Sequence, residues 1–407
     1  LASAAGHIGA GIHGGWIGMT GRVRALAAVA AFLAAAAGCG SSARSGAPDN
    51  GPSYTIGLLT DLTGPAASSS RTSVEGADAG QALARAAGLN LRFVTADTGT
   101  SPTGALTAAQ KLVQQDHVLA VVTVSALAFA AAGYLTSQGI PVVGVAEDGP
   151  EWRTAPNMFS VYGALDTTKV GTTAGQFFKS QGVTDVGTLG YGISPTSSEA
   201  AKSAAASAES AGLRVGYLNA NFPFGSTNVQ PVALAMKSAG VNGLEATVDP
   251  NTAFALITAL RQLGDDPTVA LLPTGYGGDL TQAGPGALGT AQGVYFSLQF
   301  EPVERRTPAT ERFQSALRAA GVTSEPTDAE YAGYTSVALL VAGLQKAGAD
   351  PGRASLISAL NGVRHFDAAG LLGNHRFDLS DRAGTAPSCR VVSAAAGAGA
   401  VQGAVRD

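Results

Sequence analysis

Leu119-Ala-Val-Val-Thr-Val124 is a run of apolar and β-branched residues and the clearest indicator of fold class in this chain. A strand that is apolar at nearly every position is buried on both faces, which is typical of parallel sheets covered by helices. Helical patterns flank it at 105–116 and 126–138. Strands that alternate with helices predict βαβ units, and therefore an α/β fold with parallel sheets.

The same alternation continues on both sides of this run. Strands are expected at 54–60, 91–96, 119–124, 141–146, 186–189, 213–218, 244–248, 269–272 and 294–298. Helices are expected at 74–87, 105–116, 126–138, 168–181, 198–211, 230–239, 252–263, 310–320 and 329–347. The segment 148–163, which contains Pro and Gly, interrupts the series and is expected to cross to a second lobe; another break follows Phe296. Two Rossmann-like lobes would place a ligand cleft at the carboxyl ends of their strands.

The region from Met19 to Cys39 predicts export. Arg22 and Arg24 precede the apolar run 25–37, and Gly38-Cys39 follows. This order is typical of a secretory signal, and the run is shorter than the ~20 residues that span a bilayer. Cys39 after small residues resembles a lipobox, although Ala36 stands where Leu is usual.

These features divide the amino-terminal part of the chain. We expect residues 1–18 to precede the true start, 19–38 to be a lipoprotein signal peptide, and Cys39 to carry the lipid. The polar segment 39–53 is expected to be a flexible tether. An ordinary cleaved signal with an incidental cysteine is the alternative.

Composition limits the function classes. The chain has 45% hydrophobic and 13% charged residues and a net charge of -4 without charge runs, which describes a folded chain and argues against nucleic acid as a partner. The two cysteines are Cys39 and Cys389. If Cys39 is lipidated, no structural disulfide is expected, and the role of Cys389 stays open.

Catalytic and cofactor motifs are missing from the sequence. The GxGxxG pattern at Gly284–Gly289 precedes an expected strand instead of following one, so it lacks the context of a dinucleotide site. His117, His365 and His375 have no metal-ligand spacing. There is no phosphate-binding loop and no G-x-S-x-G elbow. We therefore expect no enzyme activity, no cofactor and no metal.

Several segments together carry a family resemblance. They are Ile56-Gly-Leu-Leu-Thr-Asp-Leu-Thr-Gly-Pro65 with Glu75-Gly76, Asp97 with Thr107-Ala-Ala-Gln-Lys-Leu112, Gln138-Gly-Ile-Pro-Val-Val143, Pro326-Thr-Asp-Ala-Glu-Tyr-Ala-Gly-Tyr-Thr335 and Gly373-Asn-His-Arg-Phe-Asp378. In order and spacing, the chain from Tyr54 to about Val392 resembles the branched-chain (Leu/Ile/Val) amino-acid-binding type of solute receptor, which has the type I periplasmic-binding-protein fold.

The resemblance implies two lobes joined by a hinge of three crossovers. One lobe would comprise 54–163 and 297–365, the other 164–296 and 366–393, and 394–407 would form a loose tail. The implied function is that of a monomeric receptor of an ABC importer. It would be exported and lipid-anchored at Cys39 on the outer face of the cytoplasmic membrane. It would pass a small polar solute, an amino acid or a related small molecule, to permease and ATPase subunits. A ligand-sensing module that signals to a membrane partner is the alternative.

The resemblance also implies ligand-binding positions. Ser125 and backbone NH groups near Leu127 would hold a ligand carboxylate, since a helix amino terminus offers unpaired donors. Ala146 and Asp148 match the loop after the fourth strand, and Tyr191 is the aromatic residue nearest to the family's position in the other lobe.

The family's acid that pairs with the ligand ammonium aligns with Thr274, beside Tyr276. A buried ammonium needs an anion opposite it. Asp148 and Asp249 are candidates for that role, and the identity of the solute stays open.

Overall fold

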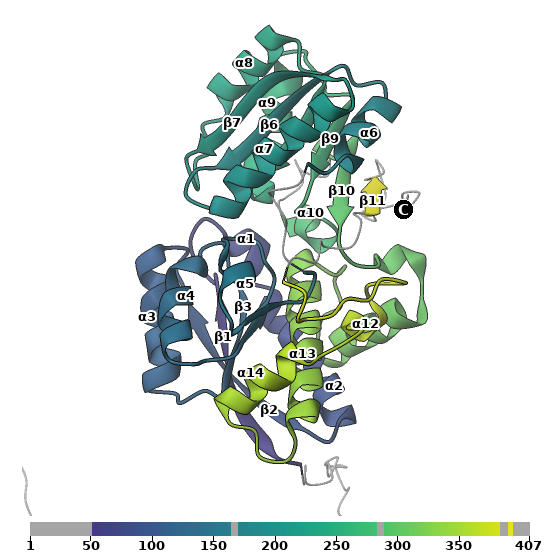
Figure 1. Cartoon of the computed structure of the whole chain (residues 1–407). Helices are drawn as coiled ribbons and strands as arrows, with labels where there is room; N and C mark the ends of the chain where they lie inside the picture. The colour runs from purple at the N-terminus through teal and green to yellow at the C-terminus, as the bar shows by residue number, and fades with distance from the viewer. Residues whose placement is uncertain (1–50, 164–169, 283–288, 383–389, 394–407) are drawn as a thin grey trace, which may run out of the picture. The chain divides into compact units, whose positions relative to one another are not determined.

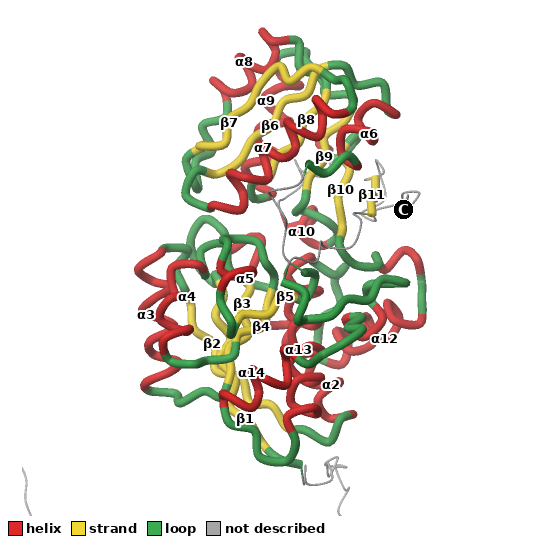
Figure 2. The backbone as a smooth tube through the Cα atoms, viewed as in Figure 1, coloured by secondary structure: helices red, strands yellow, loops and turns green. Residues whose placement is uncertain are grey.

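The computed structural model describes residues 51–163, 170–282, 289–382 and the backbone of 390–393. The predicted leader, the lipid site at Cys39, the tether, most of the Gly284–Gly289 turn, Cys389 and the tail 394–407 lie outside these residues. Two sheets organise the described chain, each covered by helices (Figures 1 and 2). The α/β prediction with two lobes is confirmed.

The first sheet has the order β2-β1-β3-β4-β5, and all its strands are parallel. The strands are β1 (Ser53–Thr60), β2 (Asn90–Asp97), β3 (Ala120–Val124), β4 (Val142–Gly144) and β5 (Met158–Ser160). Its lobe contains α1 (Ala67–Ser70), α2 (Ser73–Ala86), α3 (Pro102–Gln114), α4 (Phe129–Ser137), α5 (Glu151–Thr154), α12 (Pro308–Ala319), α13 (Asp328–Ala347) and α14 (Arg353–Asn361). The central strand β3 is buried at all five positions, as its apolar sequence predicts.

The second sheet has the order β11-β10-β9-β8-β6-β7. Its strands are β6 (Asp185–Tyr191), β7 (Arg214–Phe222), β8 (Gly243–Thr247), β9 (Val269–Leu272), β10 (Val294–Leu298) and β11 (Arg390–Ser393). Its lobe contains α6 (Thr173–Ser180), α7 (Pro195–Ser210), α8 (Gln230–Ala239), α9 (Pro250–Gln262) and α10 (Gly278–Gln282). Of the described strands in this sheet, only β11 runs antiparallel, beside β10. The order of the elements along the chain gives three passages between the lobes: after β5, after β10 and before β11.

Capping chemistry sets where the helices begin. Four of them start with a capping residue followed by Pro: Ser101-Pro102, Ser194-Pro195, Asp249-Pro250 and Thr307-Pro308. The capping side chain accepts a backbone N–H, and Pro is favoured in the first turn because it lacks one. Helix α13 has a capping box instead, in which Thr327 and Glu330 satisfy each other's backbone N–H groups. Three of these starts, at Ser101, Ser194 and Asp249, lie just after the carboxyl ends of strands β2, β6 and β8.

Some elements differ from the sequence prediction. The segment 148–163 was expected to be a crossing, but it contains α5 and β5, and the chain leaves the first sheet only after β5. Helix α14 was not predicted. In the segment 373–378, which carries part of the family resemblance, Phe377 forms only an isolated bridge with Phe366, and the late strand that joins the second sheet is β11.

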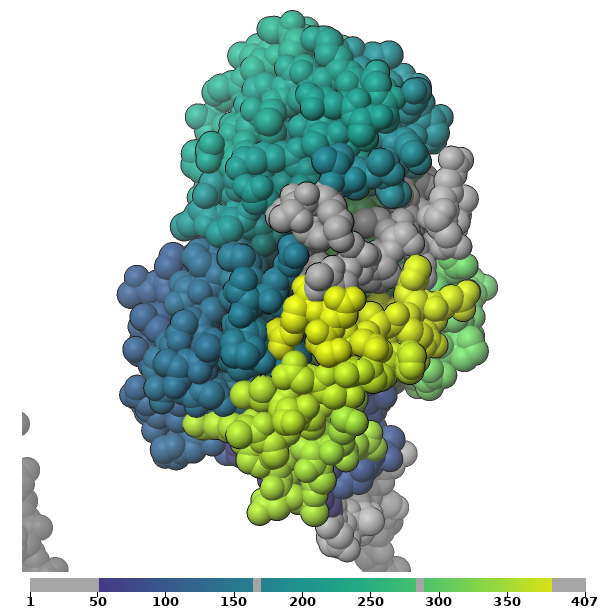
Figure 3. Space-filling model, in the orientation of Figure 1, coloured from purple at the N-terminus to yellow at the C-terminus, as the bar shows by residue number. Residues whose placement is uncertain are grey.

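The predicted lobe boundary at 366 also differs from the structure. Residues 366–382 pack against the first lobe, where they lie beside α14 on the face seen in Figure 3. The Arg382 guanidinium lies 4.6 Å from the Phe159 ring centre and donates hydrogen bonds to the carbonyls of Ala155 and Pro156. The two hydrogen bonds, one part-buried and one exposed, and the ring contact hold the segment to the first lobe.

Helices α2 and α13 cross at two glycines, Gly76 and Gly333. A Cβ atom on Gly333 would overlap the Ser73 carbonyl oxygen and lie 2.8 Å from the Ala77 nitrogen. We expect Gly333→Ala to destabilise the protein by about 1–3 kcal/mol, because the two backbones must move apart. Chemical denaturation of the purified protein measures this change.

Gly133 provides the matched control. It is exposed within α4, and a Cβ atom there would meet no heavy atom within 4 Å. Gly133→Ala is expected to stabilise the protein by about 0.5–1 kcal/mol through helix propensity. Equal effects of the two substitutions would contradict the close crossing of α2 and α13.

Candidate functional site

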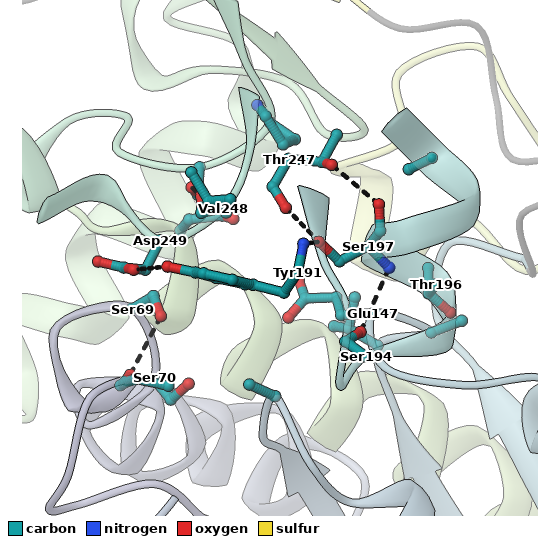
Figure 4. Close-up of a pocket in the computed structure, with 18 of the residues that line it drawn as sticks. Ser69, Ser70, Glu147, Tyr191, Ser194, Thr196, Ser197, Thr247, Val248 and Asp249 are labelled. Atoms are coloured by element: carbon teal, nitrogen blue, oxygen red, sulfur yellow. Dashed lines mark hydrogen bonds between the residues drawn. The ribbon is translucent and has the colours of Figure 1, made fainter. Parts of the chain in front are cut away.

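A pocket of about 230 Å³ lies where loops of both lobes meet. Its walls come from the loop that contains α1, the loop after β4, and the residues that follow β6, β8, β9 and β10. Figure 4 shows Tyr191, Glu147 and Asp249 among the side chains that line it. The pocket therefore lies at the carboxyl ends of the strands, as an open α/β sheet predicts.

The pocket combines acidic and aromatic side chains. Its acids are Glu147, Asp249, Asp279 and Asp328, and its aromatic residues are Tyr162, Tyr191, Phe224 and Phe300. Among the described residues that line it, none is Lys, Arg or His. The remaining wall consists of small hydroxyl residues, alanines, Gln299 and the apolar residues Val145, Val248, Pro273 and Leu298.

Asp279 and Asp328 are brought together where α10 meets the start of α13. Gly277, at φ +62°, forms a bridge with Thr327, and the Gly278 N–H donates to the Pro326 carbonyl at 3.0 Å. The Asp328 backbone N–H donates to Asp279 Oδ2 at 3.3 Å. Asp279 is 2% exposed, and its Oδ1 has no hydrogen-bond partner.

Burial raises the pKa of these acids, and their mutual repulsion adds to the effect. The pKa of Asp279 rises to about 8, mainly through burial; Glu330 and Glu147 raise it further, while the Asp328 N–H and Arg71 lower it. The pKa of Asp328 also rises to about 8, through burial and then through Asp279.

The pKa of Glu147 is raised by burial and then by three other acids, Asp328 foremost. Its side chain is exposed to the pocket, so water there offsets part of the effect of burial. The four acids of the pocket therefore differ in how much solvent reaches them.

Elsewhere in the pocket, Tyr191 and Asp249 form a satisfied pair. The Tyr191 hydroxyl donates to Asp249 Oδ2 (Figure 4), and the Thr252 hydroxyl donates to the same oxygen at 2.6 Å. The Thr252 backbone N–H donates to Asp249 Oδ1 at 3.2 Å. Phe224 contacts the Tyr191 ring edge-on at 4.8 Å between centres. Asp249 therefore differs from Asp279, because both its oxygens already accept hydrogen bonds.

The start of α4 was predicted to hold a ligand carboxylate, but the chain's own carboxylates occupy its donors. The Ser125 hydroxyl donates to Asp61 Oδ1 at 2.7 Å, and the Ala126 N–H donates to Asp61 Oδ2 at 2.8 Å. The Phe129 N–H donates to Asp148 Oδ2. A helix amino terminus does bind anions here, and the anions are Asp61 and Asp148.

The seven predicted ligand-binding residues fall into two groups. Ala146, Tyr191 and Thr274 line the pocket, and the Thr274 hydroxyl donates to the Val248 carbonyl at 3.0 Å. The others, Ser125, Leu127, Asp148 and Tyr276, are buried and are not among the lining residues.

The polar groups of the buried residues bond within the chain. The Leu127 N–H donates to the Ser125 hydroxyl at 3.2 Å, the Trp152 indole N–H donates to Asp148 at 2.9 Å, and the Tyr276 hydroxyl donates to Glu304 at 2.5 Å. A ligand role for any of the seven residues stays a prediction.

Sequence reasoning did not single out Glu147, Asp279 or Asp328 as site residues. Glu147 follows the predicted fourth strand, which is a usable signal. Asp328 follows the Thr327 cap, where an acid is also explained by the helix dipole. Asp279 gives no signal in the sequence, because its place in the pocket depends on the contact between α10 and α13.

Two further kinds of site were searched for in the structure. Within the described residues, no group of three His, Cys, Asp or Glu side chains is arranged to hold a metal ion. None of the helices in the described part of the chain has the length and hydropathy needed to span a bilayer.

Solved structures share the fold along most of the chain. The leucine-binding protein LivK of Thermotoga maritima is 20% identical, with a TM-score of 0.72 over 86% of this chain and 98% of that one. LivJ of Streptococcus pneumoniae, in complex with isoleucine, is 19% identical, with a TM-score of 0.70 over 84% and 96%. A solute-binding protein of an ABC transporter from R. palustris, in complex with 4-hydroxybenzoate, is 16% identical, with a TM-score of 0.72 over 87% and 96%.

A search of curated proteins finds no match. A comparison with family profiles agrees with the structural similarity. The sequence profile of a family described as periplasmic binding protein matches residues 53–398, which is most of the chain. The chain therefore belongs to the periplasmic binding protein family and has the type I fold of branched-chain amino-acid-type substrate-binding proteins.

Proposed function

We propose that this protein is the extracytoplasmic solute-binding receptor of an ABC importer. The observation that carries the proposal is the pocket, which both lobes line at the carboxyl ends of their strands. In this family fold, a solute held between lobes is enclosed by hinge motion. Structural neighbours that are named as transporter components support the importer role.

Contacts between the lobes are consistent with opening and closing. At the pocket rim, Asn251 donates to Ser68 at 3.1 Å, and Arg71 donates to Gln282 at 2.8 Å; both bonds are exposed. The Ser194 hydroxyl donates to the Asp148 carbonyl at 3.2 Å. The two exposed hydrogen bonds are readily exchanged for water, whereas the Ser194–Asp148 bond is buried, so the buried contact carries more of the free-energy cost of opening. The three chain crossings would form the hinge.

The proposal includes a membrane partner and an anchor. The receptor would work as a monomer, with lipid at Cys39 holding it to the outer face of the cytoplasmic membrane and the permease and ATPase subunits receiving the solute. Support for the anchor comes from the sequence around Cys39, which lies outside the described residues.

An uptake experiment tests the importer role. The purified full chain should release a bound solute on denaturation, which mass spectrometry identifies. Cells that lack the gene are then expected to take up that labelled solute at least tenfold more slowly, and the intact gene should restore uptake. Equal uptake with and without the gene would contradict the importer role, and retained solute binding would then favour sensing.

Two neighbouring residues of α7 provide matched variants for this test. Ala200 lines the pocket, whereas Glu199 is exposed and is not among the lining residues. Ala200→Trp should block the pocket and fail to restore uptake, because an indole ring occupies much of so small a cavity. Glu199→Trp should restore it. If both variants restore uptake, the solute does not bind in this pocket.

A further inference from the structure

The charge of the pocket indicates the class of solute, if the proposed function is correct. We propose that the solute is a small organic cation without a carboxylate, an amine or ammonium compound, and that Asp279, Asp328 and Glu147 hold its positive charge. Four independent features of the described residues support this assignment.

The first feature is the unpaired oxygen of Asp279. Asp279 lines the pocket, is 2% exposed, and its Oδ1 has no hydrogen-bond partner. Buried carboxylate oxygens nearly always accept a hydrogen bond, because an unmet one is costly. Oδ1 is itself buried, so a rotation of the carboxyl group would present it to an N–H donor of a bound amine, which would satisfy it.

The second feature is that none of the described residues that line the pocket is a cation. Acids raise one another's pKa across this wall, and Arg71 is the one base that acts on Asp279. Arg71 donates its hydrogen bond to Gln282 instead of to an acid of the pocket. A cationic solute would relieve the repulsion between Glu147, Asp279 and Asp328.

The third feature is the lack of an open anion site. Asp61 and Asp148 accept hydrogen bonds from the hydroxyl and N–H groups at the start of α4. An amino acid of the family type would place its carboxylate at the same donors. A second carboxylate there would face the like charge of Asp61 and Asp148. The acids of the pocket could hold the ammonium group of an amino acid, but the described residues that line the pocket include no cation for its carboxylate. This argues against a zwitterionic amino acid as the solute.

The fourth feature is the aromatic wall. Tyr162 and Phe300 lie 6.2 Å apart between ring centres, and Phe300 is stacked on Tyr331 at 3.8 Å. Ring faces attract organic ammonium groups. The described residues hold no cluster suited to a metal ion, so an organic cation fits better than an inorganic one.

A matched set of small molecules tests the assignment. Isoamylamine, leucinamide, leucine and isovalerate share one branched carbon skeleton but differ in charge, and phenethylamine and phenylacetate form an aromatic pair. Binding to the full chain is measured by titration calorimetry at pH 8. We expect at least one amine to bind at least tenfold more tightly than the zwitterion or the acid of the same skeleton.

Variants link the binding to the proposed residues. Asp279→Asn is expected to weaken amine binding about 10- to 100-fold, as the loss of a charged hydrogen bond should. Asp78→Asn, which removes one exposed acid from α2, should leave binding unchanged. Glu147→Gln serves as a second variant if Asp279→Asn folds poorly, because Glu147 is exposed to the pocket.

The outcomes separate this inference from the proposed function. Tighter binding of leucine, isovalerate or phenylacetate than of the amines would overturn the cation assignment and leave the receptor role intact. Amine binding that Asp279→Asn and Glu147→Gln do not weaken would overturn the assigned residues. The absence of amine binding would overturn the inference, whereas equal uptake with and without the gene would overturn the importer role.

Discussion

Asp61→Ala is expected to lower the free energy of unfolding by about 3–5 kcal/mol, since each buried donor left unpaired costs about 1–3 kcal/mol. Asp61 is fully buried at the end of β1. It accepts hydrogen bonds from the hydroxyls of Thr98, Ser125 and Ser70 and from the Ala126 N–H. The hydroxyls can rotate to other acceptors, but the Ala126 N–H cannot. Chemical denaturation measures the loss.

The Asp61 carboxylate is buried in a low-dielectric environment, which disfavours its charged form. Burial raises the pKa of Asp61, although the hydrogen bonds from Thr98, Ala126 and Ser125 oppose the rise. Its removal therefore also relieves some unfavourable burial, and for this reason the expected loss is below the sum for four donors.

Two controls identify the cause of the destabilisation. Asp61→Asn should destabilise the protein less, because its amide oxygen can still accept the Ala126 N–H. Acetate should raise the melting temperature of Asp61→Ala more than that of the wild type, since it can occupy the vacated anion site at the helix amino terminus. If acetate has equal effects on both proteins, Asp61 is not the anion that satisfies these donors.

The sequence allows prediction of elements whose periodicity is strong. Strand β3 is apolar at nearly every position, so its burial and the parallel sheet could be predicted. Strand β5 has three residues and helix α14 has nine. A three-residue strand has no measurable period, and β5 is held by its pairing with β4. Such elements depend on tertiary contacts that one sequence does not reveal.

The chemistry of the site could also be predicted only where it depends on residues close together in the sequence. The prediction that Ser125 and the start of α4 bind an anion rests on local chemistry, and the structure shows that pattern with Asp61 as the anion. Which carboxylate occupies the donors could not be predicted, because Asp61 lies 64 residues before Ser125 in the chain. Asp279 and Asp328 are likewise joined by a contact across 49 residues. Local capping is encoded locally, but a pocket wall is assembled from distant segments.

The unliganded protein is expected to lose stability as pH rises from 5 to 8. The pKa values of Asp279 and Asp328 rise to about 8, and those of Glu245 and Glu330 rise to about 7, mainly through burial. Between about pH 5 and the folded pKa of each group, the unfolded chain has released the proton and the folded chain still holds it. The unfolded state then binds fewer protons, so each such group lowers the free energy of unfolding by up to about 1.4 kcal/mol per pH unit. Melting temperatures at pH 5.5, 7 and 8.5 measure the trend.

Asp279→Asn should flatten this trend and raise the melting temperature at pH 8, because it removes a buried acid without removing the oxygen that accepts the Asp328 N–H. The groups that face Asp279 are Glu330, Glu147, Asp328 and Arg71, so its titration is coupled mainly to other acids. If stability instead rises with pH, or if the variant keeps the wild-type trend, these acids are ionised in the folded state. A cationic solute needs them ionised, so its affinity should increase over the same pH range in which the unliganded protein weakens. As pH rises, ionisation of Asp279 and its neighbouring acids should therefore lower the stability of the protein and increase its affinity for the cation. A purely structural role of Asp279 would not produce this opposite dependence.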